Sequence, residues 1–228
     1  LFQSADGEIF VFHTGMEPSH LDHHIKIETY TAAEIKQMRL CNCDLIETFL
    51  PVNTFDEVLE HLKGKCKMNL DRSIGIIEPV MKMVRRHGME DQILMKSDPS
   101  EQSLKLIEAY APDIDYMPIF MEEDHASEKI EKMKIHYAGA ELVFKTEQSP
   151  IVQEAYLEEQ KKKGRVLWGN AILYSSRVPL AGGHSDDISL LEDPAQGWGW
   201  LAQKGFDIIQ TDWAMHCVNY LRENNYRK

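Results

Sequence analysis

The sequence predicts an α/β protein in which strands and helices alternate as in a (β/α)₈, or TIM, barrel. The main observation is a series of six short apolar runs, at residues 66–70, 92–96, 115–120, 140–144, 165–170 and 206–210. The first five runs begin about every 25 residues, and amphipathic segments lie between them. Strand, helix and strand at this spacing are typical of parallel βαβ units. Six such units exceed what a simple three-layer sheet needs, which favours a barrel.

The length of the chain limits how much of a barrel it can form. A complete barrel takes about 250 residues, whereas this chain has 228, and residues 14–53 have the pattern of a loop-rich insertion. The rest is too short for eight units. We therefore expect a single domain over residues 1–228 with the insertion inside it. The barrel should be incomplete at the N-terminus, without its first strand, its first helix and part of its second strand.

The segments between the apolar runs carry helix signals. In residues 54–64, Thr54 is a candidate N-cap, Glu57 occupies the capping-box position, and Gly64 follows the last helical turn. Four further segments have similar amphipathic patterns and are also predicted to be helical: residues 77–88, 100–111, 127–139 and 149–164.

The first 13 residues predict a β-hairpin. Asp6-Gly7 is a strong signal for a two-residue turn between apolar runs. In that register Leu1 faces Phe12, and His13 faces the position before Leu1. Cross-strand neighbours have Cβ atoms about 5 Å apart, so a residue at that position would share a site with His13. His13 also fits a strand-end histidine that is capped by water or by a backbone carbonyl.

Composition excludes some classes of partner. The net charge of −12 argues against nucleic acid or an anionic membrane surface, and no apolar run approaches the ~20 residues of a membrane span. A phosphate-containing substrate remains compatible, because a bound metal can supply positive charge. The four cysteines, Cys41, Cys43, Cys66 and Cys217, lack zinc-site spacing, so we expect free thiols and a cytoplasmic protein.

Four stretches resemble the glycerophosphodiester phosphodiesterase family, in order and over essentially the whole chain. SADGEIFVFHTG resembles the family's T-x-D-G…V-x-H-D hairpin, and TFDEVLEHLKGKCKMNLD resembles its helix and strand ending in an acidic metal ligand. GRVLWGNAI resembles its Trp-x-x-Asn strand, and GWGWLAQKGFDIIQTDW resembles its closing G-x-D-x-I-x-T-D strand and helix.

This resemblance implies a TIM barrel with a small insertion after the first hairpin. It implies metal-dependent hydrolysis of glycerophosphodiesters, small molecules derived from phospholipids, to an alcohol and glycerol 3-phosphate, with Ca²⁺ or Mg²⁺. It also implies a His-Arg-Gly strand and a Glu-x-Asp strand upstream of Leu1, the Asp immediately before it. We therefore expect activity from the full-length parent and not from these 228 residues alone.

The resemblance assigns the two central roles. His13 matches the second family histidine and is expected to act as an acid or base, since phosphodiester cleavage needs proton transfer to the leaving alkoxide. Asp71 ends the 66–70 run and matches the metal-binding acid, although the family more often has Glu. An aspartate there could alternatively cap a helix.

Five further residues are candidates for substrate binding. Lys96 closes its run and could contact phosphate or be a solvated strand-end lysine. Glu141 lies inside an apolar strand, where a charge is costly without a partner, so it is either a group in the barrel mouth or part of an ion pair under a helix. Trp168 and Asn170 match the substrate-side Trp-x-x-Asn, with core packing as the alternative for Trp168. Trp213 could line the glycerol pocket.

Two polar stretches could suggest metal binding. GGHSDD at 182–187 is interpreted as a lid or structural loop, because it has no fixed spacing to other ligands. SHLDHH at 19–24 places His20 and His24 four residues apart, but no helix pattern surrounds them. We therefore expect a surface loop there.

The sequence departs from the family pattern at two positions. Thr14 stands where the family has Asp after the histidine, and Ser73 stands where it has a phosphate-binding Lys. Lys96 or Arg72 could supply that positive charge. These departures support an alternative function, a non-catalytic barrel that binds a phosphorylated ligand or partner. A third reading is a TIM-barrel lyase or aldolase with Lys96 as the Schiff-base lysine.

Overall fold

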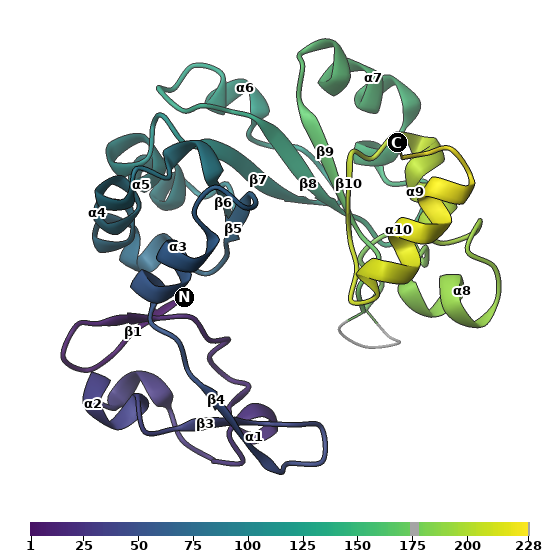
Figure 1. Cartoon of the computed structure of the whole chain (residues 1–228). Helices are drawn as coiled ribbons and strands as arrows, with labels where there is room; N and C mark the ends of the chain where they lie inside the picture. Colours follow the sequence, from purple (N-terminus) through teal and green to yellow (C-terminus); the bar gives the residue numbers. More distant parts are fainter. Residues whose placement is uncertain (174–177, 228) are drawn as a thin grey trace. The chain divides into compact units, whose positions relative to one another are not determined.

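The chain divides into two compact units of α/β structure. The computed structural model describes residues 1–173 and 178–227. The first unit comprises Leu1–Lys96 and Lys105–Asp115, and the second comprises Ser97–Leu104 and Tyr116–Lys228. Figure 1 shows the order of the elements along the chain.

The first unit begins with a hairpin and the insertion and continues with two parallel strands. Its elements are β1 (Phe2–Gln3), β2 (Ile9–Phe10), α1 (Glu17–His20), η1 (Ile27–Thr29), α2 (Ala32–Ile35), β3 (Arg39–Cys41), β4 (Glu47–Pro51), α3 (Phe55–Leu62), β5 (Met68–Leu70), η2 (Ile74–Ile76), α4 (Ile77–His87), η3 (Glu90–Gln92) and β6 (Ile93–Ser97). Strand β5 pairs with β6 in parallel, Met68 opposite Ile93 and Leu70 opposite Met95. Helix α5 (Glu101–Tyr110) contributes residues to both units.

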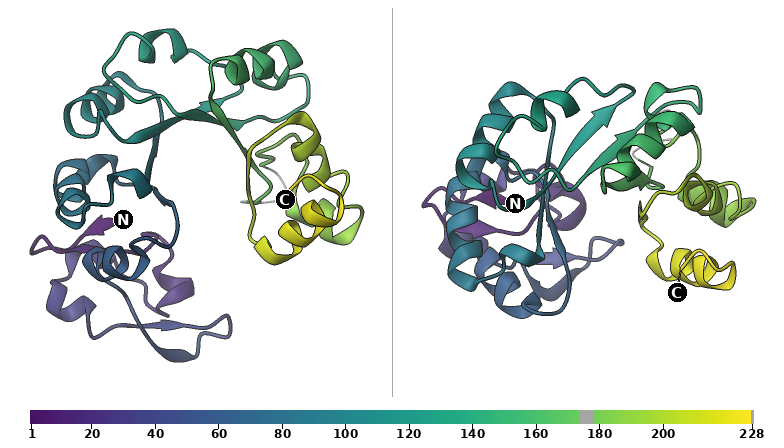
Figure 2. Two further views of the ribbon diagram at one scale, coloured as in Figure 1. Left: turned by 45° about the horizontal axis from the view of Figure 1, so that its top comes forward. Right: turned by 90° about the horizontal axis from the view of Figure 1, so that it is seen from above.

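The second unit continues the alternation with four parallel strands. Its elements are β7 (Asp115–Met121), α6 (Ser127–Ile130), β8 (Gly139–Val143), η4 (Pro150–Val152), α7 (Glu154–Lys162), β9 (Val166–Asn170), α8 (Asp186–Leu191), α9 (Trp198–Lys204), β10 (Ile208–Gln210) and α10 (Ala214–Glu223). Strands β7, β8, β9 and β10 are neighbours in chain order. The last two helices, drawn in yellow and yellow-green, lie beside each other (Figure 2). Because all four strands are parallel, their carboxyl ends share one edge of this sheet.

The predicted alternation of strands and helices is confirmed. Each of the six apolar runs contains a strand, and the capping box of Thr54 and Glu57 is present at the start of α3. The result is an α/β fold consistent with part of a (β/α)₈ barrel. The predicted helix at 127–139 is wrong beyond Ile130. Tyr116 N donates to His136 O at 2.9 Å and Ala138 N donates to Tyr116 O at 3.0 Å, so strand pairing overrides the helical pattern there.

The predicted register of the first hairpin is wrong by one residue. Phe2 pairs with Phe10, and Ser4 N donates to Glu8 O at 2.8 Å, so the loop contains Ala5, Asp6 and Gly7. The cause is the Asp6 carboxylate. It accepts hydrogen bonds from Ser4 Oγ at 2.7 Å and from Ala32 N at 2.8 Å, and these bonds lower the pKa of Asp6.

This register changes the environment predicted for His13. Val11 N donates to Asn53 O at 3.0 Å, so after Phe10, the last residue of β2, the chain stops pairing with β1 and turns towards the segment before α3. His13 is therefore not part of the hairpin ladder. The cross-strand argument for a neighbour immediately before Leu1 fails, and that neighbour now rests on the family resemblance alone.

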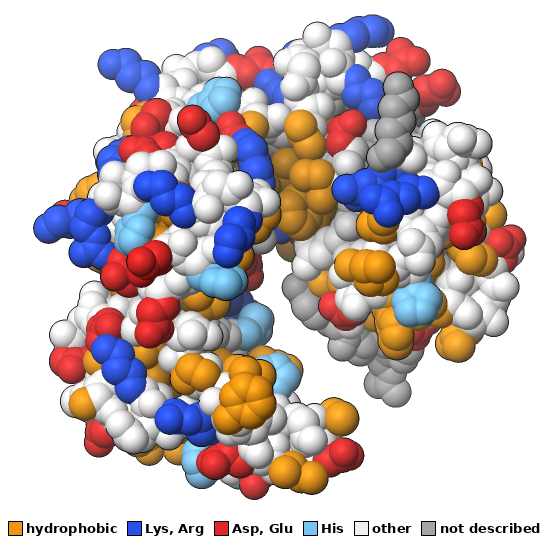
Figure 3. Space-filling model, in the orientation of Figure 1, with side chains coloured by type: hydrophobic (Ala, Val, Ile, Leu, Met, Phe, Trp, Pro, Cys, Tyr) orange, Lys and Arg blue, Asp and Glu red, His pale blue; other side chains and the backbone are white. Residues whose placement is uncertain are grey.

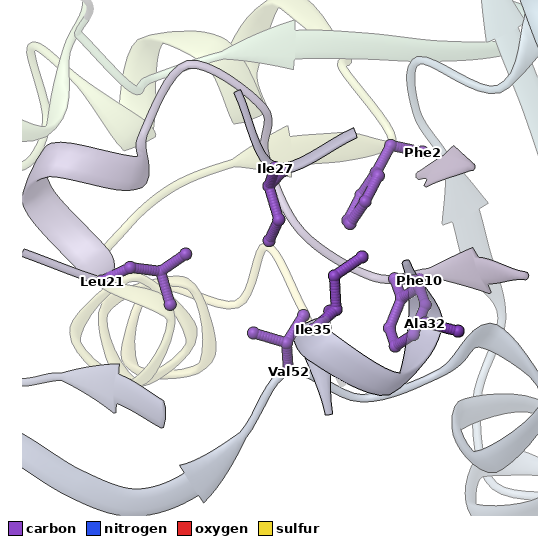
Figure 4. Packing of buried hydrophobic residues seen from close by; sticks show 7 residues of the cluster. All are labelled: Phe2, Phe10, Leu21, Ile27, Ala32, Ile35 and Val52. Carbon is purple, nitrogen blue, oxygen red and sulfur yellow. The ribbon is translucent and has the colours of Figure 1, made fainter. Parts of the chain in front are cut away.

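The hairpin and the insertion share a small hydrophobic core (Figure 4). Its buried members are Phe2, Phe10, Leu21, Ile27, Ala32, Ile35 and Val52. The rings of Phe2 and Phe10 stack with centroids 5.7 Å apart, which the observed register makes possible because it puts them directly opposite each other. The loop-rich insertion predicted at 14–53 thus contains short elements that are packed onto the hairpin.

A buried arginine organises the amino end of β9 in the second unit. Arg165 is 7% exposed, and its guanidinium lies 3.8 Å from the centre of the Tyr137 ring. It donates to Gln160 Oε1 at 2.6 Å and pairs with Glu131. The Tyr137 hydroxyl in turn lies 2.6 Å from Ser127 Oγ. These contacts tie α6, α7 and the start of β9 together.

Charge on the surface is mixed. Lys and Arg side chains alternate with Asp and Glu over the face seen in Figure 3. None of the helices in the described part of the chain combines the length and the apolar character that crossing a membrane requires.

All four cysteines are free, as predicted, and they should differ in reactivity. Burial raises the pKa of Cys217 to about 11, whereas Cys43 and Cys66 are exposed. Because the thiolate is the reactive form, a raised pKa leaves little reactive Cys217 at pH 8. We expect Ellman's reagent at pH 8 to modify Cys43 and Cys66 quickly and Cys217 only after unfolding in urea. Peptide mapping would identify the modified residues, and fast native labelling of Cys217 would contradict its burial.

Candidate active site

A cavity of about 460 Å³ in the first unit contains the two residues assigned to the central roles. His13 and Asp71 both line it, as do Lys67, Asn69 and Arg72. Its remaining lining is largely apolar and comes mainly from α3 and β5: Leu1, Val11, Phe12, Phe55, Val58, Leu62, Cys66, Met68 and Leu70. The structure therefore brings together a histidine and a carboxylate that lie far apart in the sequence.

Asp71 is placed by the strand that precedes it. Met68 and Leu70 of β5 are buried, and Asp71 follows at the carboxyl end of the strand in an exposed turn. The alternative role as a helix cap is not observed, because the next helical residues begin at Ile74 with Ser73 in the N-cap position. An exposed carboxylate at this edge is free to face a ligand.

Ser73 has a structural role. It is completely buried, and its hydroxyl donates to Leu70 O at 2.8 Å. The same hydroxyl lies 3.8 Å from the sulfur of Met95 on the neighbouring strand. The position at which the family resemblance would place a phosphate-binding lysine is thus used to close the turn after β5.

Lys96 lies at the carboxyl end of β6 and is only 5% exposed. It is therefore not a solvated strand-end lysine. It does not belong to the described lining of the His13–Asp71 cavity. Contact with a phosphate stays a prediction for this residue.

The second unit brings three predicted residues onto one face of its sheet. Glu141 pairs with Trp168, and Asn170 follows two residues later on the same strand. Asn170 Nδ2 donates to Glu141 Oε1 at 2.8 Å, and both side chains are buried. Side chains of paired residues share a face of the sheet, and so do residues two apart.

This face is opposite to the one that packs on α9. A Cβ at Gly169 would lie 3.0 Å from Phe206 and 3.1 Å from Leu201, so the Gly169 side faces that helix. Glu141 and Asn170 consequently point away from α9. Asn170 provides the hydrogen bond that a buried carboxylate requires.

Gln210 is a residue of this face that the sequence analysis did not select. It pairs with Asn170 in the register of β9 and β10, and its Oε1 accepts a hydrogen bond from Trp168 Nε1 at 3.1 Å. The position of Gln210 in the sequence is the signal that could have identified it. Gln210 is the polar residue that ends an apolar run at the same edge as Asn170.

Asp186, from the GGHSDD stretch, holds the segment after β10 in place. It is 3% exposed, and its Oδ1 accepts from Trp198 Nε1 at 2.7 Å and from Thr211 Oγ1 at 2.6 Å. Its Oδ2 accepts from Asp212 N at 2.9 Å. Trp213, the next residue, is 48% exposed and precedes α10. Asp186 thus fixes the backbone of Asp212, which is adjacent to Trp213, the residue predicted to line the pocket.

The histidine of the same stretch is also used structurally. His184 stacks on Trp200 with ring centres 3.7 Å apart, and its Nε2 lies 3.1 Å from Glu147 Oε1. These contacts agree with the structural loop expected at 182–187. In the SHLDHH stretch, His20, His23 and His24 are all exposed, but the loop expected there is only partly observed, because Ser19 and His20 belong to α1.

A metal site is not complete within the chain as described. Within residues 1–173 and 178–227 there is no group of three or more His, Cys, Asp or Glu side chains that could hold an ion. Asp71 offers one carboxylate at the cavity, and Ca²⁺ takes six to eight oxygen ligands. The residues present do not by themselves form a metal site.

Comparison with known proteins gives the fold. The chain matches a phosphodiesterase structure from Parabacteroides distasonis with a TM-score of 0.78 and 17% identity, covering 97% of this chain and 73% of that one. The fold is that of the glycerophosphodiester phosphodiesterases. An enzyme of this name from Agrobacterium tumefaciens matches with a TM-score of 0.61 and 19% identity, over 92% of this chain and 80% of that one.

A third phosphodiesterase structure includes a ligand. The Oleispira antarctica phosphodiesterase, solved in complex with the product sn-glycerol-3-phosphate, matches with a TM-score of 0.64 and 18% identity, over 97% of this chain and 82% of that one. A sequence family described as a domain of unknown function matches residues 116–221. Among curated proteins no match is found. The phosphodiesterase fold confirms the resemblance predicted from the four sequence stretches.

Proposed function

We propose that the protein is a phosphoric diester hydrolase that converts glycerophosphodiesters to an alcohol and glycerol 3-phosphate. The observation that carries this proposal is the joint placement of His13 and Asp71 on one cavity, in a chain with a phosphodiesterase fold. The substrates would be phospholipid-derived small molecules in the cytoplasm. The bound product of the Oleispira antarctica enzyme supports this choice of substrate class.

His13 would transfer the proton that the reaction requires. Cleavage of a phosphodiester leaves an alkoxide, and an imidazole can donate a proton to it at neutral pH. The side chain of His13 is exposed at the cavity, so a substrate can reach it. Asp71 lines the same cavity, so a carboxylate is available beside the group that transfers the proton.

A divalent ion is part of the proposal, with Asp71 as a ligand. Mg²⁺ keeps several waters and binds through one or two carboxylates together with substrate phosphate, so a single aspartate suits it better than it suits Ca²⁺. A bound ion would neutralise charge on the phosphoryl oxygens. We assign no step to it, because the described residues supply only part of its coordination.

The remaining candidates would bind substrate. We propose that Lys96 contacts the phosphate and that Trp213 lines the pocket for the glycerol moiety. Glu141 and Asn170 form a buried hydrogen-bonded pair that could orient a hydroxyl group, with Trp168 beside them. The assignments of Trp168 and Asn170 rest on the resemblance, and those of Lys96, Glu141 and Trp213 rest on the position of each residue near the carboxyl end of its strand or just after it.

An activity assay tests the proposal directly. The full-length protein should release glycerol 3-phosphate from glycerophosphocholine when Mg²⁺ or Ca²⁺ is added, and EDTA should abolish the release. An enzyme-coupled assay for glycerol 3-phosphate would measure it. No release with either ion, using glycerophosphocholine, glycerophosphoethanolamine and glycerophosphoglycerol, would reject the proposed activity.

One observation favours the second candidate function, a non-catalytic barrel that binds a phosphorylated ligand. Ser73 is buried and closes a turn, so the lysine of the family pattern has no equivalent at that position. Thr14, in place of the family's Asp after the histidine, brings no charge beside His13. Calcium binding by calorimetry, together with no release of glycerol 3-phosphate, would support this function instead.

A further inference from the structure

Arg72 has a backbone conformation that its side chain does not favour. Its φ is +52°, in the left-handed region where glycine and asparagine are the common residues. The residue lies in the turn after β5, between Asp71 and the buried Ser73. Non-glycine residues in this region occur preferentially at functional sites, where the local strain is retained for a purpose. An arginine here therefore requires an explanation from its side chain.

Arg72 lines the same cavity as His13 and Asp71. Its Nη1 lies 3.5 Å from Thr14 O, a long contact that puts the guanidinium beside the residue next to His13. The residue is exposed, so this position is accessible to a ligand. The side chain thus reaches from the end of β5 to the segment that carries His13.

Three of the other arginines of this acidic chain pair with carboxylates. Arg85 pairs with Asp113 and Arg86 pairs with Asp56, both at the surface. Arg165 pairs with Glu131. For Arg72, by contrast, the described residues include no ion-pair partner within 4.0 Å. In a chain of net charge −12, a cavity arginine in this state is available to an external anion.

The other basic side chain in the cavity lining already has a carboxylate partner. Lys67 pairs with Asp115, which belongs to the same unit. Lys96 is buried and lies outside the described lining of this cavity. Arg72 is therefore better placed than either lysine to bind a phosphate group next to His13.

We propose that Arg72 binds phosphoryl oxygens in this cavity and supplies the positive charge that a lysine at position 73 would otherwise supply. A guanidinium matches phosphate geometry with two parallel N–H donors, which a lysine cannot reproduce. The identity of the ligand as a glycerophosphodiester rests on the proposed function. The recognition of a phosphoryl oxyanion does not, since inorganic phosphate presents the same oxygens.

Calorimetric titration tests this assignment without turnover. The full-length protein would be titrated with inorganic phosphate and with glycerol 3-phosphate at about 50 mM salt. We expect Arg72→Gln to weaken the binding of both by about 10- to 100-fold and Arg72→Lys to weaken it by a smaller factor. A preference for glycerol 3-phosphate over inorganic phosphate would assign the site to the substrate, and equal affinity would assign it to the phosphate group alone.

A glycine substitution separates the side chain from the backbone. Arg72→Gly removes the strain at φ +52°, so its melting temperature should be equal or higher, while its phosphate affinity should fall as in Arg72→Gln. Leu45→Gly is the matched control, because Leu45 has φ +59° and lies outside the cavity. That variant should keep its phosphate affinity.

Two results would overturn the assignment: no phosphate binding by the unchanged protein, or unchanged affinity in Arg72→Gln. Arg72-dependent phosphate binding without release of glycerol 3-phosphate would sustain the inference about Arg72. It would at the same time reject the proposed hydrolysis, so the two failures can be told apart.

Discussion

Replacing His13 by glutamine is expected to lower kcat for the release of glycerol 3-phosphate by about 10²- to 10⁴-fold. A general acid or base contributes a factor of this size, and an amide cannot transfer the proton. Because the side chain is exposed at the cavity, its removal should leave the melting temperature within about 2 °C of the original. The variant should therefore be folded and nearly inactive.

The measurement is steady-state kinetics on the full-length protein as a function of pH. His125→Gln is the matched control, since that side chain is 74% exposed, belongs to the second unit and is not among the residues that line the cavity. The control should retain normal kcat. Activity of His13→Gln within about threefold of the original would show that His13 carries no proton in the reaction.

Replacing Asp186 by asparagine is expected to destabilise the fold by about 2–4 kcal/mol. The carboxylate accepts three hydrogen bonds, from Trp198, Thr211 and the backbone N–H of Asp212. Asparagine keeps one acceptor oxygen and turns an amide donor towards at least one of these donors. A buried donor without a partner costs about 1–3 kcal/mol, and hydrogen bonds to charged groups are at the strong end.

Urea unfolding followed by circular dichroism would measure this loss. Asp187→Asn is a close control, because Asp187 is the adjacent residue of the same helix and is exposed. It should change the free energy of unfolding by less than about 0.5 kcal/mol. Equal stability of the two variants would mean that the Asp186 network does not hold the segment after β10.

The alternation of strands and helices was predictable because it depends on local patterns. Thr54 and Glu57 form their capping box from residues three apart, and each parallel strand overlaps a continuous apolar run. The carboxyl-end positions of Asp71, Lys96 and Asn170 follow from the same runs. Hydrophobic periodicity records which residues are buried, and parallel strands must be connected by crossovers.

The features that the sequence did not reveal depend on contacts between distant residues. The register of the first hairpin is set by Asp6, whose carboxylate binds a backbone N–H in the insertion, at Ala32. The helix predicted after Ile130 yields to pairing with Tyr116. Local propensity contains no information about such partners.

The candidate site also combines residues that the sequence predicted with features that only the structure revealed. The roles of His13 and Asp71 came from the family resemblance, and the structure adds that both line one cavity. Asp186 was missed because its partners, Trp198 and Thr211, lie in later elements that no local motif connects to it. Arg72 was one of two candidates for the phosphate-binding charge, and its backbone conformation became visible only in the structure.

The two ends of strand β9 carry different groups of interacting residues. The buried Arg165 with its partners stands at the amino end, and Asn170 with Glu141 stands near the carboxyl end, five residues or roughly 17 Å of strand away. A change in the Arg165 cluster can alter the resistance to unfolding while the opposite edge keeps its geometry. During divergence, this half of the chain could therefore gain or lose thermal robustness independently of what it recognises.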